Sequence, residues 1–407
     1  MSGLTSKLAL ATLTLVSANV QAEDSDWEVD TTYLSYVEAD NRVSVAKSMA
    51  NLTREQEGKK LSVNLVHDTM SGSSPTGAVR SSDSAVTFTG VSGGTGFSAG
   101  NGSDYSLSTF EDTRIQAGFN LSSPSSRAVT IDYGAVVSQE SDFDSVGGNV
   151  GFTRESTDKL ASFTMGLAAT FDSIYQSDSG ATPQPLGDVT QNQAFGKGQR
   201  NTLDALVGGT RVLNKQTVAQ VNVSLSLSNG YHSDPYKIIS ATTENNQIIA
   251  NYHDSRPESR VRTSLFGNVV HQLGDTPHSI HIGYRAYYDD WGINSHTADF
   301  RYHRQLTRRQ YLEPHVRVYR QSQADFYYRR FYVDDALNPI LPSDGLASSD
   351  YRLDAMTSVT LGMKYGLALT KNTDLRVRAE YLAQTFDNDD YSKNNAIVFQ
   401  TSLKYKF

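Results

Sequence analysis

The sequence predicts an all-β protein, a transmembrane antiparallel β-barrel of about sixteen strands. Segments of strand length in which apolar and polar residues alternate recur along the chain. The connections between them alternate between tight polar turns and long loops, as in a barrel with turns at one membrane surface and loops at the other. The last segment is also amphipathic and ends on Phe407.

The start of the chain has the pattern of a secretory signal peptide. Lys7 precedes a short apolar run from Leu8 to Val16, and Val20-Gln21-Ala22 then offers a small-residue cleavage site. The apolar run is too short to cross a bilayer as a helix. We therefore expect a signal peptide over residues 1–22 and a single barrel domain over residues 23–407.

The strand positions follow from the period-two alternation. Between Val129 and Ser138, for example, Val, Ile and Tyr take every second position, with Thr130 and Asp132 between them. The segment over 41–54 alternates poorly and is the least regular of the set. In chain order, the expected strand cores are 26–38, 41–54, 59–70, 113–122, 127–140, 146–155, 160–175, 200–213, 217–231, 260–272, 278–292, 296–306, 311–325, 354–368, 374–387 and 395–407.

The connections indicate two different ends of the barrel. The expected tight turns are 56–59, 122–127, 156–159, 214–216, 274–277, 307–309 and 370–374. The expected long loops are 73–112, 177–199, 234–259 and 328–353. An even strand count places both termini on the periplasmic side. A soluble sandwich or propeller is the alternative fold, but it does not explain why short and long connections take turns.

The closing strand resembles the terminal strand of bacterial outer-membrane β-barrels. From Ile397 onward every second residue is apolar or Thr, and the strand finishes with Tyr405 and Phe407. The resemblance implies a bacterial outer-membrane location, with Phe407 as part of the signal that the outer-membrane assembly machinery reads. Aromatic residues near strand ends suit the two membrane interfaces. They are Trp27, Tyr133, Tyr284, Tyr288, Tyr381 and Tyr405.

The composition excludes several classes of function. The chain has no Cys, so disulfides, Cys-ligated iron–sulfur clusters and Cys–Zn sites are ruled out. Lys and Arg number 36 against 44 Asp and Glu, so the basic surface expected of a nucleic-acid-binding protein is missing. We expect no cofactor and no nucleic-acid partner.

The expected inward positions differ between the two halves of the chain. In the first half they are mostly small and neutral with occasional acids, and from Arg260 onward they are charged. The acids of the first half are Asp68, Asp132, Glu140 and Asp172. We interpret the charged set either as a pore wall for polar or anionic solutes or as a lattice of ion pairs that stiffens a closed barrel. The histidines also raise the hypothesis of a metal site, although they lie on separate strands without local ligand spacing. The candidate pore-lining residues are Arg260, Arg262, His281, Arg285, Arg301, His303, His315, Arg317, Arg376, Arg378 and Glu380.

One pair of neighbouring residues offers a candidate for catalysis. His67 and Asp68 are similar to the His/Asp pairs of outer-membrane proteases, and make a hydrolase an alternative. The sequence contains neither a G-x-S-x-G elbow nor an H-E-x-x-H motif. His67 falls on the expected lipid face near the outer rim, where we expect it to contact headgroups. We therefore expect no enzymatic activity and assign no catalytic residue.

The segment from His67 to Ala78 is the most distinctive local sequence. We expect the end of the strand over 59–70, which includes Asp68, and then tight turns in which Gly72 and Gly77 allow positive φ and Pro75 fixes its own. These turns open the long loop over 73–112.

The same segment resembles a motif, Y-D-x-x-T-G-A-S-P-x-G-A, of an uncharacterised family of bacterial outer-membrane β-barrels, a domain of unknown function. Elements at Tyr36–Val43 and Ser138–Phe143 extend the resemblance, whereas His67, Ser71 and Ser73 depart from the motif. The family implies gene neighbours that encode a small lipoprotein, a thioredoxin-fold protein and a flavin transferase. By that association, the resemblance implies an extracytoplasmic redox or metal-handling system.

Three functions follow as hypotheses. The first is an outer-membrane channel or conduit for a polar solute, or for a partner in such a redox or metal-handling system. The second is a closed barrel that anchors or scaffolds periplasmic or surface partners, and the third is an outer-membrane hydrolase. The expected partners are outer-membrane lipid and the assembly machinery, with a periplasmic lipoprotein or a thioredoxin-fold protein as further candidates.

Overall fold

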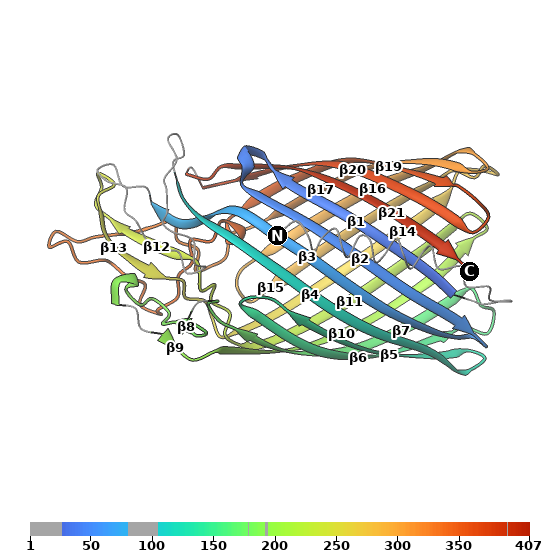
Figure 1. The fold of residues 1–407 in the computed structure, drawn as a ribbon, viewed down its shortest axis with the longest axis horizontal. Coiled ribbons are helices and arrows are strands. Elements are labelled where there is room, and N and C mark those ends of the chain that lie inside the picture. The colour runs from blue at the N-terminus through green and yellow to red at the C-terminus, as the bar shows by residue number, and fades with distance from the viewer. Residues whose placement is uncertain (1–26, 80–104, 178, 192–193, 389) are drawn as a thin grey trace.

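Sixteen strands of the computed structural model form one closed antiparallel barrel, which confirms the predicted fold class (Figure 1). The structure describes residues 27–79, 105–177, 179–191, 194–388 and 390–407. Within these ranges, no helix is long and apolar enough to cross a membrane. The predicted signal peptide lies outside the described residues.

Each predicted strand core corresponds to one barrel strand, including the irregular segment over 41–54. Each strand of the barrel pairs with its two neighbours in the order of the chain, and β1 pairs with β21 to close the barrel. The barrel strands are β1 Trp27–Glu38, β2 Val43–Gln56, β3 Lys59–Val79, β4 Tyr105–Ser126, β5 Val129–Gln139, β6 Phe143–Glu155, β7 Ala161–Ile174, β10 Gly198–Asn214, β11 Thr217–Gly230, β14 Ser259–Gln272, β15 Ser279–Asp289, β16 Asn294–Thr307, β17 Gln310–Gln321, β19 Met356–Ala368, β20 Thr373–Phe386 and β21 Lys393–Lys406.

The outer face of the barrel is apolar. Successive residues of a strand point to opposite faces, so the alternation seen in the sequence separates an outer from an inner surface. Leu65, Ile115 and Ile397 on the outer face are 53%, 60% and 60% exposed. Large apolar side chains this exposed are costly in water and favourable in lipid. The polar side chains between them face the lumen.

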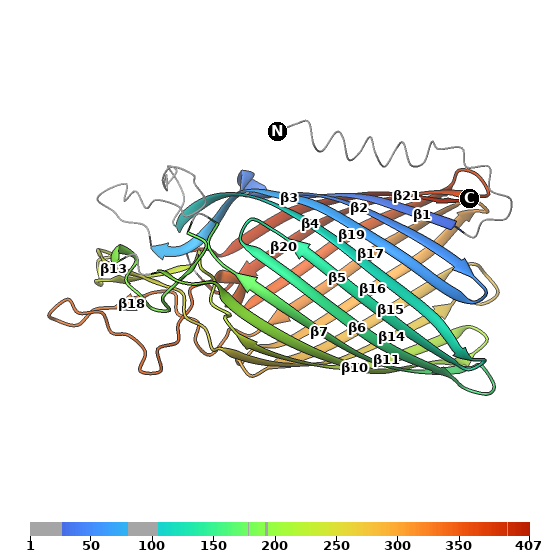
Figure 2. The same cartoon turned by 60° about the horizontal axis from the view of Figure 1, so that its bottom comes forward.

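The two ends of the barrel differ, as the connection lengths predicted. At one end, here called the turn end, the connections are short. Glu57 and Gly58 join β2 to β3 with φ values of 52° and 75°, the backbone of a two-residue hairpin turn whose twist matches that of the strands. The strand β1 begins and β21 ends at this end, near the C-terminus in Figure 2. The long connections lie at the opposite, loop end (Figure 2).

The strands β3 and β4 continue well beyond the barrel rim, which corrects the predicted loop over 73–112. Residues up to Val79 and from Tyr105 onward are paired strand, so Asp68, Gly72, Pro75 and Gly77 lie in β3 and not in a loop. The prediction was wrong because Gly and Pro usually end a strand. Residues 80–104, the middle of the predicted loop, lie outside the described residues.

The long connections fold into a structure above the loop end, which we call the cap. It comprises residues 175–177, 179–191, 194–197, 231–258 and 322–355 and lies beyond the barrel in Figure 1. The sequence predicted long connections here, and they have secondary structure of their own. Its elements are β8 Thr182–Pro183, η2 Val189–Gln191, β9 Ala194–Phe195, β12 Ile238–Thr242, β13 Ile248–His253, β18 Phe331–Tyr332 and η3 Tyr351–Leu353.

The cap contains the buried apolar core of the molecule. One cluster packs Ile239 and Ala241 of β12 against Phe331 of β18 and against Ala347. A second cluster joins the cap to the barrel rim, and consists of Trp291, Ile293, Ala324, Phe326 and Leu353. Burial of such side chains contributes roughly 1.5–3 kcal/mol each, so the cap is a packed unit.

Candidate functional site in the lumen and its mouth

The charged half of the lumen is a lattice of pairs between neighbouring strands. His315 on β17 lies between two carboxylates, with Nε2 2.7 Å from Asp299 Oδ2 and Nδ1 2.9 Å from Glu380 Oε1. His303 lies 3.5 Å from Glu313, which also accepts a hydrogen bond from Lys364 at 2.7 Å. His281 instead lies 3.2 Å from the hydroxyl of Ser279.

The three histidines therefore have separate partners. Among the described residues, none of the three belongs to a group placed to hold a metal ion. The lattice interpretation of the sequence thus describes this part of the wall.

Most predicted pore-lining arginines also have partners. Arg260 donates from Nε to Asp289 at 2.9 Å and lies over the ring of Trp291, 4.0 Å from its centroid. Arg376 donates to Asp30 of β1 at 2.6 Å. The remaining pairs are Arg262 with Ser226, Arg301 with Asp299, and Arg378 with Gln400.

Arg285 on β15 and Arg317 on β17 differ from the other arginines. Within the described chain, neither has a carboxylate in ion-pair range. Both are exposed to the lumen, and both line a cavity of about 900 Å³ at its loop end. The cavity extends from the barrel wall to the inner surface of the cap.

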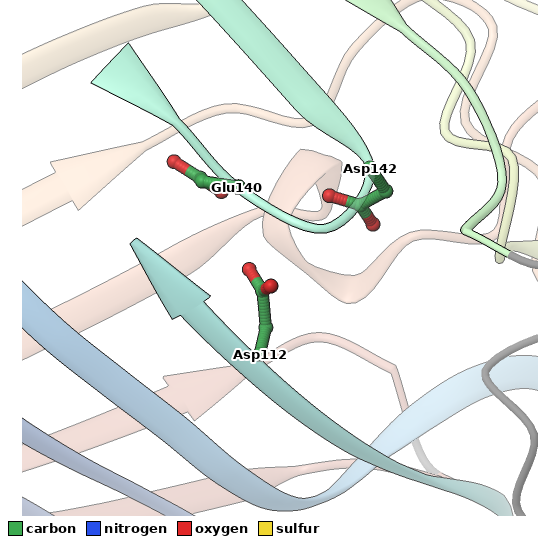
Figure 3. Close-up of side chains that lie close together, drawn as sticks. All are labelled: Asp112, Glu140 and Asp142. Carbon is green, nitrogen blue, oxygen red and sulfur yellow. The ribbon is translucent and has the colours of Figure 1, made fainter. Parts of the chain in front are cut away.

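Three carboxylates face the same cavity from the opposite wall (Figure 3). Asp112 of β4, Glu140 and Asp142 each place an oxygen within 4.8 Å of the others. Glu140 and Asp142 belong to the β5–β6 connection. Going round the barrel in either direction, β17 is the eighth strand from β5. The acidic group and Arg317 are therefore diametrically opposed.

The acidic group is only partly neutralised. Burial, reinforced by nearby Asp112, raises the pKa of Glu140 to about 7, although Arg114 opposes the shift. Burial likewise raises the pKa of Asp142. Asp112 is held by the backbone N–H and hydroxyl of Ser141, at 3.2 and 2.6 Å. An ionised cluster of this kind is costly without cations or water around it.

A buried ionic network holds the cap together. Asp350 accepts from Arg256 at 3.0 Å and from the Nε of Arg352 at 2.9 Å, and Arg256 also donates to Asp254 at 2.6 Å. Asp254 and Asp350 are each only 1% exposed. Burial disfavours the ionised form of Asp350, but Arg352, Lys237 and Arg256 outweigh it and hold its pKa well below the usual range.

Two glycines of the motif segment lie where a side chain would clash with the surrounding structure. A Cβ on Gly77, whose φ is +95°, would lie 1.9 Å from Ser349 Oγ. A Cβ on Gly72, whose φ is +131°, would lie 1.7 Å from the carbonyl oxygen of Arg42. Lys237 donates to the carbonyl oxygen of Pro75, and Val79 N–H donates to Ser240 at 2.9 Å. These contacts join β3 to the cap.

His67 and Asp68 point to opposite faces of β3. Asp68 faces the lumen, where Arg114 donates to both of its oxygens, at 3.1 and 2.7 Å, and Lys47 lies 3.0 Å away. His67 is on the outer face, as predicted, but it is buried and not open to solvent. The two side chains do not form the pair that the hydrolase hypothesis requires.

The barrel-closing residues lie at the seam between β21 and β1. Tyr405 is opposite Val29 in the pairing register, and Phe407 N–H donates to the carbonyl oxygen of Trp27 at 3.0 Å. The rings of Tyr405 and Phe407 stack with centroids 5.7 Å apart.

The sequence did not reveal the residues of the cap network or the acidic group. Lys237, Arg256 and Asp350 lie in segments without periodicity, so nothing in the sequence indicates that they meet. Asp112 lies on β4, and Glu140 follows the end of β5. They could have been brought together only by the register of β4 with β5.

The closed barrel, its apolar exterior and its polar interior define the chain as a bacterial outer-membrane β-barrel protein. The family model described as "Protein of unknown function (DUF3570)" matches residues 5–401, and the chain belongs to this family. The resemblance seen in the sequence is thereby confirmed. No curated protein matches the chain.

Solved structures with a similar fold are other outer-membrane barrels. CdiB from Acinetobacter baumannii is 9% identical with a TM-score of 0.50, over 95% of this chain but only 61% of CdiB. A bacterial polysaccharide outer membrane secretin is 8% identical with a TM-score of 0.48, covering 94% and 98% of the two chains. OccK11 (OpdR) from Pseudomonas aeruginosa is 7% identical with a TM-score of 0.43, covering 94% and 95%. At these identities the likeness concerns the fold alone.

Proposed function

We propose that the protein is a channel through which small polar solutes cross the outer membrane. The proposal rests mainly on the charged cavity of about 900 Å³ at the loop end of the lumen. Arg285 and Arg317, which have no carboxylate partner in the described structure, face it. Such guanidinium groups need water or a solute around them, since an unpaired charge is costly in a dry interior.

Conductance of the purified protein in a planar bilayer tests this proposal. We expect discrete current steps in KCl. Replacing Arg285, Arg301 and Arg317 together by Glu should move the reversal potential in a salt gradient toward cation selectivity. The matched control is Arg320→Glu, which makes the same charge change on the outer face of β17. An unchanged reversal potential in the triple variant would mean that these side chains do not line the conducting path.

A closed barrel that anchors partners is the second candidate, and the buried network of the cap favours it. A channel requires that the cap leave a path, or open one. A protein that inserts but carries no current, both as wild type and with the cap network broken by Asp350→Asn, would support the anchor and contradict the channel. The periplasmic lipoprotein or thioredoxin-fold partner stays a prediction, which co-purification from membranes of the native host would test.

A further inference from the structure

The wall of the mouth cavity contains an unassigned arrangement on three adjacent strands. Arg285 of β15 is paired in register with Thr297 of β16, and Asp299 of β16 is paired with Arg317 of β17. Thr297 and Asp299 are two residues apart on one face, which is a spacing of roughly 7 Å along the strand. Register therefore places the two arginines on either side of the same short stretch of β16, and both side chains line the cavity.

Asp299, which could neutralise Arg317, already has other partners. The oxygens of Asp299 accept from Arg301 at 3.0 Å and contact His315 at 2.7 Å. Arg285 lies over the ring of Phe266, 5.5 Å from its centroid, which holds the guanidinium without supplying a counter-charge. The hydroxyl of Thr297, between the two arginines, has no hydrogen-bond partner among those found in the described structure.

We propose that Arg285, Thr297 and Arg317 form a subsite that binds the carboxylate group of a small solute. Two guanidinium groups and a hydroxyl supply donors suited to a planar carboxylate, and charge-assisted hydrogen bonds of this kind are the strong ones. All three side chains of the subsite line the cavity, so a solute inside the lumen can reach them.

A carboxylate fits better than phosphate because of the charge across the cavity. Asp112, Glu140 and Asp142 lie on the diametrically opposite wall, and their negative charge opposes a dianion more than a monoanion. The preferred ligand is therefore a monocarboxylate, and a carboxylate that also carries an amine is compatible with this field. The inference deepens the proposed function, since it rests on the lumen being the path of the solute.

Arginine footprinting tests the subsite without any current being measured. The full-length protein in detergent micelles is treated with phenylglyoxal at constant ionic strength, and modification of each arginine is quantified by peptide mass spectrometry. The probes are butyrate, succinate and inorganic phosphate. We expect Arg285 and Arg317 to be modified faster than the ion-paired Arg301, and butyrate to slow modification of the first two severalfold. No protection, or equal protection of Arg301, would overturn the subsite.

Three variants test whether the protection comes from the proposed subsite. Arg317→Gln should abolish the protection of Arg285 by butyrate, whereas Arg320→Gln, on the outer face of the same strand, should leave it intact. Thr297→Val, close in shape but without the hydroxyl, should weaken protection by roughly fivefold. Protection by phosphate at lower concentrations than butyrate would contradict the carboxylate assignment. Each variant is first checked for folding by its heat-modifiable migration in SDS gels.

The footprint and the bilayer recording can fail independently. Butyrate protection in a protein that carries no current would leave the subsite standing and contradict the channel. Current through a protein whose arginines butyrate does not protect would support the channel and contradict the subsite.

Discussion

The barrel wall and the cap both contain many ion pairs, but the surroundings of those pairs differ. In the wall, pairs such as Arg376 with Asp30 have side chains that are 34% and 25% exposed to the lumen. In the cap, Arg256 and Asp350 are 11% and 1% exposed. A hydrated pair contributes little to stability, whereas removing one member of a buried pair leaves a charge that nothing compensates. The wall should therefore tolerate changes of charge that the cap cannot.

Breaking the buried network should have the largest effect. Asp350→Asn leaves Arg256, Arg352 and Lys237 short of a shared carboxylate, and should destabilise the cap by about 3–5 kcal/mol. Hydrogen exchange of amides in 233–256 and 346–354 should accelerate, while that of β19 to β21 stays slow. The control is Asp30→Asn in the wall. Equal acceleration in both variants would contradict the difference between the two regions.

The junction between β3 and the cap should be next in sensitivity. Gly77→Ala places a Cβ against Ser349 and the carbonyl oxygen of Ile238, at a φ that side chains rarely adopt. We expect a loss of about 2–3 kcal/mol and cleavage by trypsin after Lys237. Gly345→Ala is the matched control, since its φ is also positive but the space around it is open. Equal protease sensitivity of the two variants would show that backbone strain alone is responsible.

Glu140 lies at the border between the two regions and should give a pH dependence. Its pKa is raised to about 7, so the folded protein keeps a proton that the unfolded chain releases above its ordinary value of 4.5. Stability should thus fall as pH rises from 4.5 through 7. Glu140→Gln removes this loss, and at pH 8 should gain about 1–3 kcal/mol over wild type. Thermal unfolding in detergent measures this difference in stability. Stability profiles of wild type and Glu140→Gln that run parallel with pH would disprove the prediction.

The smallest effect is expected at the rim of the wall. Lys406→Met removes a contact of 3.5 Å with Glu28 at the turn end, where the Lys406 side chain is 62% exposed. The free energy of unfolding should change by less than about 1 kcal/mol. A larger loss, measured by urea titration of the folded barrel, would mean that the seam depends on this exposed pair.

The sequence predicted the wall much better than the cap, for a physical reason. In the wall, lipid on one side and water on the other impose the alternation that is visible at Val129 to Ser138, and even the irregular β2 was placed, before the predicted turn at 56–59. The extension of β3 was missed because Gly72 and Pro75 read as turn residues. The cap has no such alternation, since residues such as Ile239 and Asp350 are surrounded by protein.

The candidate site was predicted in part for the same reason. Inward positions follow from alternation, so Arg285 and Arg317 could be named from the sequence. Which arginines lack a partner depends on register, as when Asp299 is opposite Arg317 but engages Arg301 and His315. Register is set by which residues of neighbouring strands pair, and these pairings cannot be read from the sequence.

The seam between β1 and β21 has a consequence for how the molecule assembles. Its contacts join residues far apart in the chain, such as Thr32 and Ser402, which are 370 positions apart. Contacts this distant form late, because the entropy of closing the intervening chain must be overcome first. Until then β1 and β21 each present an open edge that can pair with any exposed strand. The last step of folding is thus the one at which capture by another protein, or aggregation, competes directly with the native structure.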